Sequence, residues 1–573
     1  MREVAAPARR RGRRAGRGAA NEGPAVSWLA LDDPRERLLG RALRRQAELR
    51  PDAPFLLEDD RVHRFGEVNA RANAFAAGLR RLGVGRGDTV ALLMESTPDC
   101  VVAALGANKR GAVWVPTNTD YKGVWLRDAL EGSRARVLVA DAVHLPRLAE
   151  LGEHPFRHVV VRGGAAAASA SGAGTRAADA ARSLPGGVAF EELLAGAAPE
   201  PDDAGLHYGD TAAVLWTSGT TGRAKGVMQS HNVWLKAALN GARTTGMREG
   251  DVLYNCLPTY QSAAWVANVF RALVTGAPCA MDPRFSASDF WDRCRHYGAT
   301  ITFTLGAMHV FLWQAPERPD DADNPVRVAS AIPMPAQLEE PFKKRFGLEA
   351  ILQGYGQSEA MVLFSRGAGR AWKPNALGEP QAGVEIALLD DEDRAVARGE
   401  TGEICVRPSE PYTLFNGYFG DPDATLRAFR NLWYHTGDLA RQDEEGDTYF
   451  VDRKADYIRY KGRNLSSFAV EAAVAAHPAV AQVAAHGVPS RELESEAELK
   501  VAVVLKPGAT LTPEALARFV NETAPYFFVP RYVEFLDALP HTPTGRVQKY
   551  KLRERGVTPE TWDAVAAGFR VER

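Results

Sequence analysis

The chain has 573 residues, enough for three or four domains of about 150 residues each. Apolar residues make up 45% of the chain and charged residues 25%, which is typical of a globular protein and excludes a wholly disordered, collagen-like or coiled-coil chain. Lysine plus arginine number 70 and aspartate plus glutamate 71, so the net charge of −1 provides no basic field that would indicate a nucleic-acid partner.

The first 27 residues form a basic segment that carries seven arginines between residues 2 and 17. No apolar segment of signal-peptide type follows these arginines, which argues against a secretory signal. We expect residues 1–27 to be a disordered, solvated tail or upstream sequence read from a misplaced start codon, with a transit peptide or a nucleic-acid-binding arm as further alternatives.

Helical and strand patterns alternate from residue 28 onward. The spacing of apolar residues predicts helices over 35–49, 67–82 and 101–109, and buried strands over 89–94, 112–116 and 213–216. Strands that alternate with helices indicate βαβ units and a mainly parallel sheet, and therefore an α/β fold.

Two segments interrupt this pattern. Residues 163–183 are rich in Gly, Ala and Ser and are predicted to form a surface loop. After a second break near 452–464, helices are predicted over 468–476 and 513–522, with strands near 481–487, 499–505 and 532–536. We therefore predict a large domain over 28–452 and a small α+β domain over 453–573.

Neither a membrane span nor a disulfide framework is indicated. The longest uncharged stretch, 252–270, contains Asn, Pro, Thr, Gln and Ser, so we expect it in the protein interior. The five cysteines form no CxxC pair, which argues against a zinc ribbon and favours a reducing, cytoplasmic setting.

Residues 217–226, with the sequence TSGTTGRAKG, lie between two apolar runs and carry the strongest chemical signal. Glycines allow a loop to bend so that its amides converge on an anion, and Lys225 adds a positive charge suited to phosphate. The spacing differs from that of a Walker A loop. A simple hairpin rich in Ser, Thr and Gly would be the alternative without a ligand.

This segment resembles the phosphate loop of the adenylate-forming superfamily, which includes acyl-CoA synthetases, peptide-synthetase adenylation domains and beetle luciferases. Three further motifs of that superfamily follow in order: residues 354–359 (GYGQSE), residues 434–438 (YHTGD) and residues 540–549 (PHTPTGRVQK). The resemblance covers about residues 30–555. The residue patterns at 115–122 and 529–535 are similar to those of crotonobetaine/carnitine–CoA ligases.

The resemblance implies a fold and a set of roles. The large domain would pack mixed α/β sheets and a β-barrel-like subdomain, and the small domain would be mobile. Tyr355 would lie near adenine, Asp438 and Arg453 would contact the ribose, and Lys549 would hold the acid and the α-phosphate during adenylation.

Two groups of site residues follow from these motifs. The catalytic residues would be Lys225, Glu359 and Lys549, with Glu359 and Thr221 holding Mg²⁺. ATP would be bound by the same motifs, that is by Thr217, Ser218, Gly219, Thr220, Thr221, Gly222, Lys225, Gly354, Tyr355, Gly356, Gln357, Ser358, Asp438, Arg453 and Lys549.

The sequence departs from the superfamily pattern around the acid pocket. Gln261 replaces a His that often gates the acyl tunnel, and residues 330–333 (SAIP) stand where many members have glycines. Side chains in place of glycine should narrow the pocket, which we expect to include Tyr260, Gln261, Trp265, Ala331 and Ile332. Away from the pocket, Ala224 replaces a common Pro, and Ala455 occupies the expected hinge position.

The resemblance implies an acid–CoA ligase that forms an acyl-AMP from a small carboxylic acid and ATP and then transfers the acyl group to CoA. Delivery to a carrier-protein phosphopantetheine, and an amide- or N–N-bond-forming ligase, including one that activates nitrite, remain alternatives. A nucleotide-binding pseudoenzyme is disfavoured because Lys225, Glu359, Asp438 and Lys549 are all present. The expected partners are the acid, ATP and CoA or a carrier, without nucleic acid or a membrane span, in a monomer or homodimer.

Deleting residues 1–24 should leave the melting temperature and the turnover rate unchanged. The segment offers almost no large apolar side chains, and it precedes the first predicted helix. Thermal unfolding and steady-state kinetics of the truncated and full-length proteins check this expectation. A clear fall in either quantity would show that the basic segment docks on the body or takes part in binding.

Overall fold

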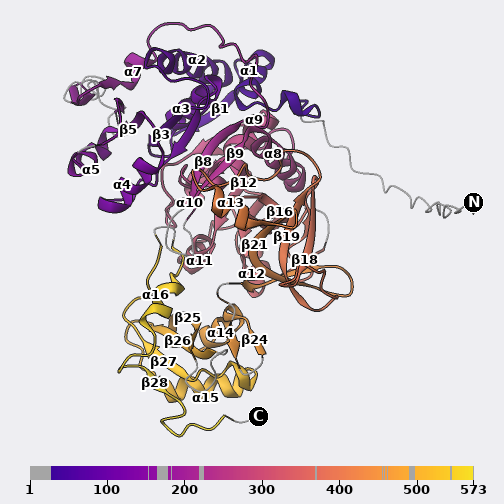
Figure 1. Cartoon of the computed structure of the whole chain (residues 1–573). Coiled ribbons are helices and arrows are strands. Elements are labelled where there is room, and N and C mark those ends of the chain that lie inside the picture. Colours follow the sequence, from indigo (N-terminus) through magenta and orange to yellow (C-terminus); the bar gives the residue numbers. More distant parts are fainter. Residues whose placement is uncertain are drawn as a thin grey trace, which may run out of the picture.

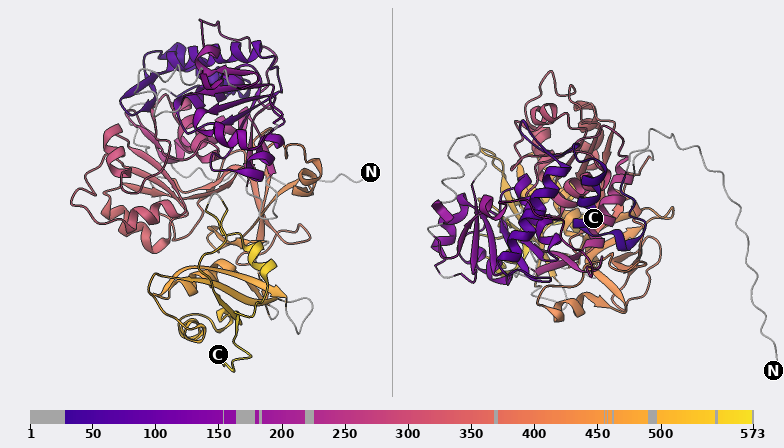
Figure 2. Two further views of the ribbon diagram at one scale, coloured as in Figure 1. Left: turned by 90° about the vertical axis from the view of Figure 1, so that its left-hand side faces the viewer. Right: turned by 90° about the horizontal axis from the view of Figure 1, so that it is seen from above.

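The computed structural model describes residues 28–152, 154–163, 179–181, 184–217, 225–367, 371–454, 456, 458–460, 463–489, 497–542 and 545–571. A large domain built from several sheets carries a smaller C-terminal domain beside it (Figure 1). The left view of Figure 2 shows the small domain, in orange and yellow, as a separate body. The predicted fold class, an α/β fold with a large N-terminal domain and a smaller α+β C-terminal domain, is confirmed.

The first seven-stranded sheet is parallel except at one edge. Its order is β14-β13-β12-β10-β11-β1-β2, in which only the β1–β2 pair is antiparallel. The strands are β1 (Pro54–Glu58), β2 (Arg61–Arg64), β10 (Leu253–Asn255), β11 (Cys279–Met281), β12 (Ile301–Leu305), β13 (Val328–Ile332) and β14 (Ala350–Leu352).

The second seven-stranded sheet repeats this arrangement with the order β7-β6-β5-β3-β4-β8-β9, where β8 and β9 form the antiparallel pair. Its strands are β3 (Thr89–Leu93), β4 (Val113–Pro116), β5 (Val137–Asp141), β6 (His158–Arg162), β7 (Gly187–Ala189), β8 (Thr211–Thr217) and β9 (Lys225–Ser230). The parallel sheets arise because helices connect successive strands.

Helices separate the two sheets and cover their outer faces. The largest apolar core joins residues of both sheets to α1 (Leu39–Leu49), α2 (Phe65–Arg81), α3 (Pro98–Lys109), α7 (Phe190–Leu193), α8 (His231–Thr245) and α9 (Phe270–Thr275). The first sheet is covered outside by α10 (Phe290–Tyr297), α11 (Ala307–Gln314) and α12 (Ala336–Arg345), and the second by α4 (Gly123–Gly132) and α5 (Leu145–Glu150). The result is a five-layered α/β arrangement.

An antiparallel β unit completes the large domain. Its five-stranded sheet contains β18 (Val384–Leu389), β19 (Thr401–Pro408), β20 (Phe429–Arg430), β21 (Trp433–Gln442) and β22 (Thr448–Arg453). A three-stranded sheet contains β15 (Gly354–Gln357), β16 (Met361–Ser365) and β17 (Glu379–Pro380), and α13 (Pro422–Ala428) lies beside β20. One apolar core holds both sheets together. This unit is the barrel-like subdomain that the resemblance implied.

The small domain has its own core between helices and a four-stranded sheet. The sheet contains β25 (Val480–Pro489), β26 (Ala497–Leu505), β27 (Tyr532–Phe535) and β28 (Trp562–Asp563), and the helices are α14 (Ser467–Ala475), α15 (Pro513–Thr523) and α16 (Lys549–Arg555). The hairpin of β23 (Ile458–Tyr460) and β24 (Arg463–Leu465) precedes α14.

The predicted helices and strands lie within a few residues of the observed ones, from α1 to β27. Residues 1–27 and most of 163–183 lie outside the described residues. Residues 252–270 are largely interior, as expected, and they include a π-helix over Ala264–Val269.

All five cysteines are buried and free. Among the described residues, no helix has the length and apolar character needed to cross a membrane.

The small domain depends on a buried ion pair. Lys500 on β26 lies 2.6 Å from Glu534 on β27, and each side chain is only 1% exposed. Replacing Glu534 by Ala would leave the buried Lys500 ammonium without this carboxylate. The free energy of unfolding should fall by about 3–5 kcal/mol. Faster hydrogen exchange of β26 and β27 would report this loss. The control Glu514→Ala removes an exposed i,i+4 pair with Arg518 and should change stability by less than about 0.5 kcal/mol. Equal effects of the two changes would contradict the expectation.

Candidate active site

The candidate site lies where several neighbouring parallel strands end. Strands β10, β12, β13 and β14 are consecutive in the first sheet and run in the same direction. The segments that follow them carry Tyr260 and Gln261 after β10, and Gly354 to Glu359 after β14. Carboxyl ends of parallel strands share one edge, where ligands bind in open α/β sheets. Motifs about 100 residues apart in the sequence are thereby brought to one edge.

The phosphate-loop segment connects β8 and β9 of the second sheet. Thr217 ends β8 and pairs with Lys225, the first residue of β9, and the Thr217 hydroxyl donates to the Lys225 carbonyl at 3.3 Å. Residues 218–224 lie outside the described residues, including Ser218, Gly219, Thr220, Thr221, Gly222 and the Ala224 substitution. The structure therefore fixes both ends of the predicted loop.

The second motif forms a tight hairpin in which two glycines are required by space. A Cβ on Gly356 would lie 1.7 Å from the Met361 carbonyl oxygen, and one on Gly354 would lie 2.6 Å from the Phe364 carbonyl oxygen. At the turn, the Ser358 carbonyl accepts a hydrogen bond of 2.7 Å from the buried Gln229. Close strand approach therefore explains the Gly-Tyr-Gly pattern without any ligand.

Glu359 follows this turn and faces Lys225 and Tyr418. The Tyr418 hydroxyl donates to Glu359 Oε1 at 3.0 Å, and Lys225 Nζ lies 4.7 Å from the centre of the Tyr418 ring. Burial raises the pKa of Glu359, and the charge of Asp438 adds to the rise, whereas Tyr418 and Lys225 oppose it. A divalent cation bound here would favour the charged carboxylate, so Glu359 fits a role in holding Mg²⁺.

Asp438 is the centre of a hydrogen-bond network between the two β sheets of the barrel-like unit. Its Oδ2 accepts from the Tyr355 hydroxyl at 2.6 Å and from Gln357 Nε2 at 2.7 Å. Tyr434 donates to Gln357 Oε1 at 2.7 Å. Burial and the adjacent Asp438 raise the pKa of Tyr355 well above its usual value, so this hydroxyl remains a donor.

Arg453 lies directly opposite Asp438 in the β21–β22 register, with its Nε 3.6 Å from Asp438 Oδ1. The structure thus brings Arg453 together with residues of the 354–359 and 434–438 motifs. A carboxylate and a guanidinium beside each other offer an acceptor and a donor to the hydroxyls of a sugar.

Lys549, at the start of α16, has its partners within the small domain. Its Nζ lies 2.5 Å from Ser467 Oγ and 2.8 Å from Glu471 Oε1. Arg546 lies in the electrostatic field of the nucleotide site: loss of hydration and the charge of Arg453 lower its pKa, and Asp438 and Glu359 oppose this shift. In this orientation, Lys549 is held by Ser467 and Glu471 of its own domain.

The expected pocket residues divide into two groups. Tyr260, Gln261 and Ile332 are half-buried, and the Tyr260 hydroxyl lies 3.5 Å from Asp120 Oδ2. Trp265 and Ala331 are fully buried members of apolar cores. Their contact with a substrate remains a prediction, and their side chains already stabilise the large domain by packing.

Two residues of the site were missed in the sequence, namely Gln229 and Tyr418. Tyr418 belongs to the segment 416–421 (NGYFGD), whose glycines and aromatics could have marked a functional turn. Gln229 gave no signal, because its role depends on packing against a hairpin about 130 residues away.

Comparison with known proteins identifies the family. The family model described as "AMP-binding enzyme" matches residues 43–419, and that described as "AMP-binding enzyme C-terminal domain" matches residues 469–546. A crotonobetaine/carnitine–CoA ligase of Salmonella arizonae is 32% identical over 502 residues, covering 85% of this chain and 91% of the relative. The corresponding protein of Salmonella typhi is 30% identical over 499 residues, with the same coverage of both chains.

Solved structures of CoA ligases share the fold. The anthranilate CoA ligase AuaEII with anthranoyl-AMP is 26% identical, with a TM-score of 0.75 and coverage of 90% of this chain and 96% of that one. A benzoate CoA ligase from Burkholderia xenovorans LB400 is 26% identical, with a TM-score of 0.76 and coverage of 90% and 99%. ATP-bound MatB from Rhodopseudomonas palustris is 25% identical, with a TM-score of 0.78 and coverage of 91% and 98%.

The family models, the relatives and the solved structures agree with the resemblance that the four ordered motifs carry. The chain therefore belongs to the AMP-binding enzyme family and is an AMP-forming acid–CoA ligase of that family.

Proposed function

We propose that this enzyme activates a small, compact carboxylic acid as its acyl adenylate and transfers the acyl group to CoA. The proposed size of the acid rests on the side chains at the end of β13. Ser330 and Ile332 bring side chains to the sheet edge where related enzymes often have glycine, and Ile332 is half-buried there. Ala331 points to the opposite face of the strand and joins the apolar core.

In the first step, a carboxylate oxygen of the acid would attack the α-phosphorus of ATP and pyrophosphate would leave. Lys225 and the loop that precedes it would bind phosphate oxygens, and Lys549 would place its ammonium between the two approaching anions. A cation at this point stabilises charge that develops in the transition state. Asp438 and Arg453 would hold the ribose, so that binding energy orients the α-phosphate.

In the second step, the thiol of CoA would attack the acyl carbon of the mixed anhydride, and AMP would leave with the bonding electrons of the C–O bond. This step does not need Lys549. Glu359 and Thr221 would hold Mg²⁺, which supplies charge neutralisation to the phosphates when bound. Glu359 is suited to this by its half-buried carboxylate near Lys225, whereas Thr221 lies outside the described residues.

Three of the relatives support an acid of modest size. They are named for CoA ligation of crotonobetaine or carnitine, of anthranilate and of benzoate. Each of these acids carries a short chain or a single ring. A long-chain fatty acid would need an open tunnel, and Ile332 stands at a position where a side chain would shorten it.

Pyrophosphate release across a panel of small, aromatic and long-chain acids, with and without CoA, tests the proposal. We expect release with one class of compact acid and formation of the matching acyl-CoA. Acyl-AMP that accumulates and reacts only with a phosphopantetheinylated carrier or an amine would assign the acceptor differently. Release with nitrite alone, or with long-chain acids alone, would overturn the proposed substrate.

Lys549→Ala should abolish most adenylation and spare thioester formation from supplied acyl-AMP. The expected loss in the first half-reaction is on the order of 10²–10³-fold, as for one donor that acts in the transition state. Lys551→Ala, a change of an exposed lysine on the same helix, is the matched control and should leave both half-reactions intact. Equal losses in both half-reactions of Lys549→Ala would show that Lys549 is structural.

Ile332→Ala should shift preference toward longer acids. If the side chain limits the pocket, its truncation would change the ratio of kcat/KM for long and short acids by about 10-fold or more. The control Val328→Ala truncates a buried residue of the same strand and should lower the melting temperature without moving this ratio. An unchanged ratio in Ile332→Ala, together with a lower melting temperature, would place Ile332 in the core.

A further inference from the structure

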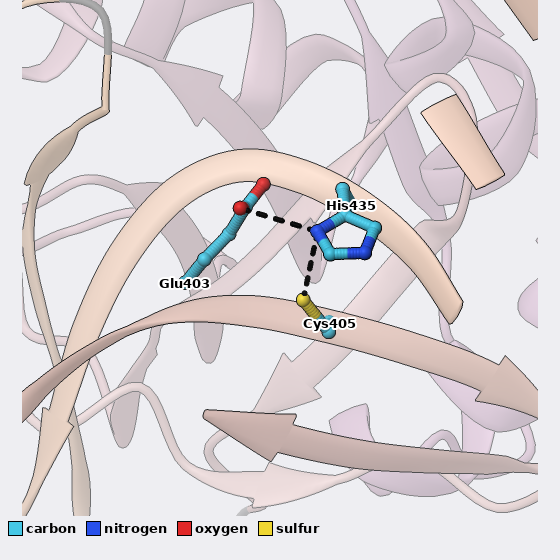
Figure 3. Close-up of side chains that lie close together, drawn as sticks. All are labelled: Glu403, Cys405 and His435. Carbon is cyan, nitrogen blue, oxygen red and sulfur yellow. Dashed lines mark hydrogen bonds and ion pairs between the residues drawn. The ribbon is translucent and has the colours of Figure 1, made fainter. Parts of the chain in front are cut away.

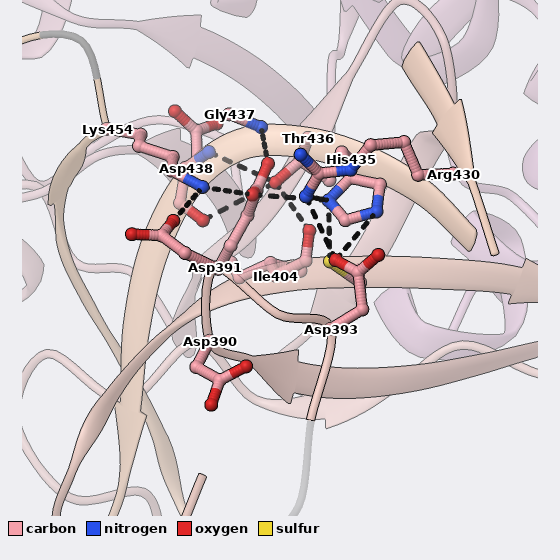
Figure 4. A network of polar contacts seen from close by, with 12 residues as sticks. Asp390, Asp391, Asp393, Ile404, Arg430, His435, Thr436, Gly437, Asp438 and Lys454 are labelled. Carbon is pink, nitrogen blue, oxygen red and sulfur yellow. Dashed lines mark hydrogen bonds and ion pairs between the residues drawn. The ribbon is translucent and has the colours of Figure 1, made fainter. Parts of the chain in front are cut away.

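Glu403 on β19 is a buried carboxylate beside the nucleotide site, and its two oxygens have different partners. Oε1 accepts from the Gly437 amide at 2.9 Å, and Oε2 lies 2.9 Å from Lys454 Nζ and 3.2 Å from His435 Nδ1 (Figures 3 and 4). Burial alone would raise the pKa of Glu403, but Lys454, His435 and the Gly437 amide lower it. The carboxylate is therefore charged and held from two sides.

Gly437 connects this carboxylate to Asp438. Its φ of +73° lies in the left-handed region that favours glycine. Its amide donates to Glu403, and its carbonyl accepts from the Lys454 amide at 2.8 Å. Glu403, Gly437 and Lys454 thus form a closed ring of three contacts. The backbone on the amino side of Asp438 is fixed by this ring.

Lys454 connects the same ring to the start of the small domain. It follows Arg453, the last residue of β22, and its Nζ also lies 2.7 Å from Asp391 Oδ1. Beyond it, the Asp456 amide donates to the Arg453 carbonyl at 2.9 Å. A turn of the small domain about this segment must change backbone angles next to Lys454. The side chain of Lys454 therefore anchors the linker to the large domain at its first residue.

A metal centre would be the other use of this cluster. Glu403, Cys405 and His435 offer oxygen, sulfur and nitrogen atoms within 4.8 Å of one another. Two cations already occupy this place, since Lys454 binds Glu403 and Arg430 lies 3.3 Å from His435 Nδ1. Burial, with the charge of Glu403, raises the pKa of Cys405 to about 12, so the thiol stays protonated near neutral pH. These charges favour an ion-pair network over a metal site.

We propose that Glu403 and Lys454 are positioning residues for the adenylation step. Glu403 Oε1 orients the Asp438 loop through Gly437, and the Glu403–Lys454 ion pair holds the linker so that the small domain faces the nucleotide site. The second part rests on the proposed two-step function. In the described orientation, the start of α14 is bound to β22, because the Ser466 hydroxyl donates to the Val451 carbonyl at 2.8 Å.

Three variants separate the two parts of this proposal, the Glu403–Gly437 contact and the Glu403–Lys454 ion pair. Glu403→Gln keeps an acceptor for the Gly437 amide and loses the ion pair with Lys454. Lys454→Met loses the ion pairs with both Glu403 and Asp391, and Glu403→Ala loses both the Gly437 contact and the ion pair with Lys454. Adenylation by Glu403→Gln and by Lys454→Met should fall about 5- to 10-fold, a typical size for a coupling between two sites. Thioester formation from supplied acyl-AMP should stay within about twofold of wild type, because the linker must leave this orientation for that step.

Glu403→Ala should also weaken ATP binding, measured by calorimetry, whereas Glu403→Gln should bind ATP as wild type does. The double variant Glu403→Gln/Lys454→Met should lose no more adenylation than Lys454→Met, since both single changes remove the Glu403–Lys454 interaction. Lys373→Met is the matched control: this half-exposed lysine pairs with Asp443 on the same β unit and should leave both half-reactions unchanged.

Hydrogen exchange tests the contacts of Glu403 and Lys454 without turnover. Failure of this proposal is therefore distinct from failure of the proposed function. We expect faster exchange of residues 436–438 in Glu403→Ala and of residues 452–456 in Lys454→Met, with wild-type melting temperatures in Glu403→Gln. Unchanged exchange in these segments, or equal losses in both half-reactions, would overturn the proposal. A cobalt–thiolate absorption band that Co²⁺ induces in wild type and not in Cys405→Ser would also overturn it, in favour of a metal centre.

Discussion

The buried carboxylate of Asp438 is the constraint on which the arrangement of the site depends. A charged group out of water must be paired and hydrogen-bonded, and Asp438 meets this need with Tyr355 and Gln357 from another sheet. The same residue lies opposite Arg453 in the register of β21 and β22. One side chain therefore ties the nucleotide motif, the barrel-like unit and the start of the small domain together.

Parallel topology supplies the second condition for function. The ends of β10, β12, β13 and β14 meet at one edge because these strands run in the same direction. This places the segment that begins after Asn255, the residues that close β13 and the hairpin that follows Leu352 around one space. The rigid layers behind this edge hold the segments in place, so specificity for the acid can change through a few side chains at strand ends.

The charges of the small domain fit a protein that uses more than one orientation. Lys549 is paired with Glu471 inside its own domain, which keeps its ammonium from lying unpaired when it is away from the phosphates. Its participation in adenylation requires exchange of this carboxylate for the anions of ATP and the acid. The ion pair of Lys454 with Glu403 lies at the other end of the small domain's connection and restrains the linker. A switch between orientations thus exchanges one set of ion pairs for another, which keeps its free-energy cost small.

The sequence by itself determined the local elements and the family. Apolar periodicity located α2, β3 and β26 closely, because burial on one face is a local property of the chain, and four ordered motifs identified the chemistry. Only the tertiary structure decided that Gln229 binds the Ser358 carbonyl, that Tyr418 supports Glu359 and that Glu403 meets Lys454 across 51 residues. These contacts follow from strand order and register, which join distant segments and leave no periodic trace in the sequence.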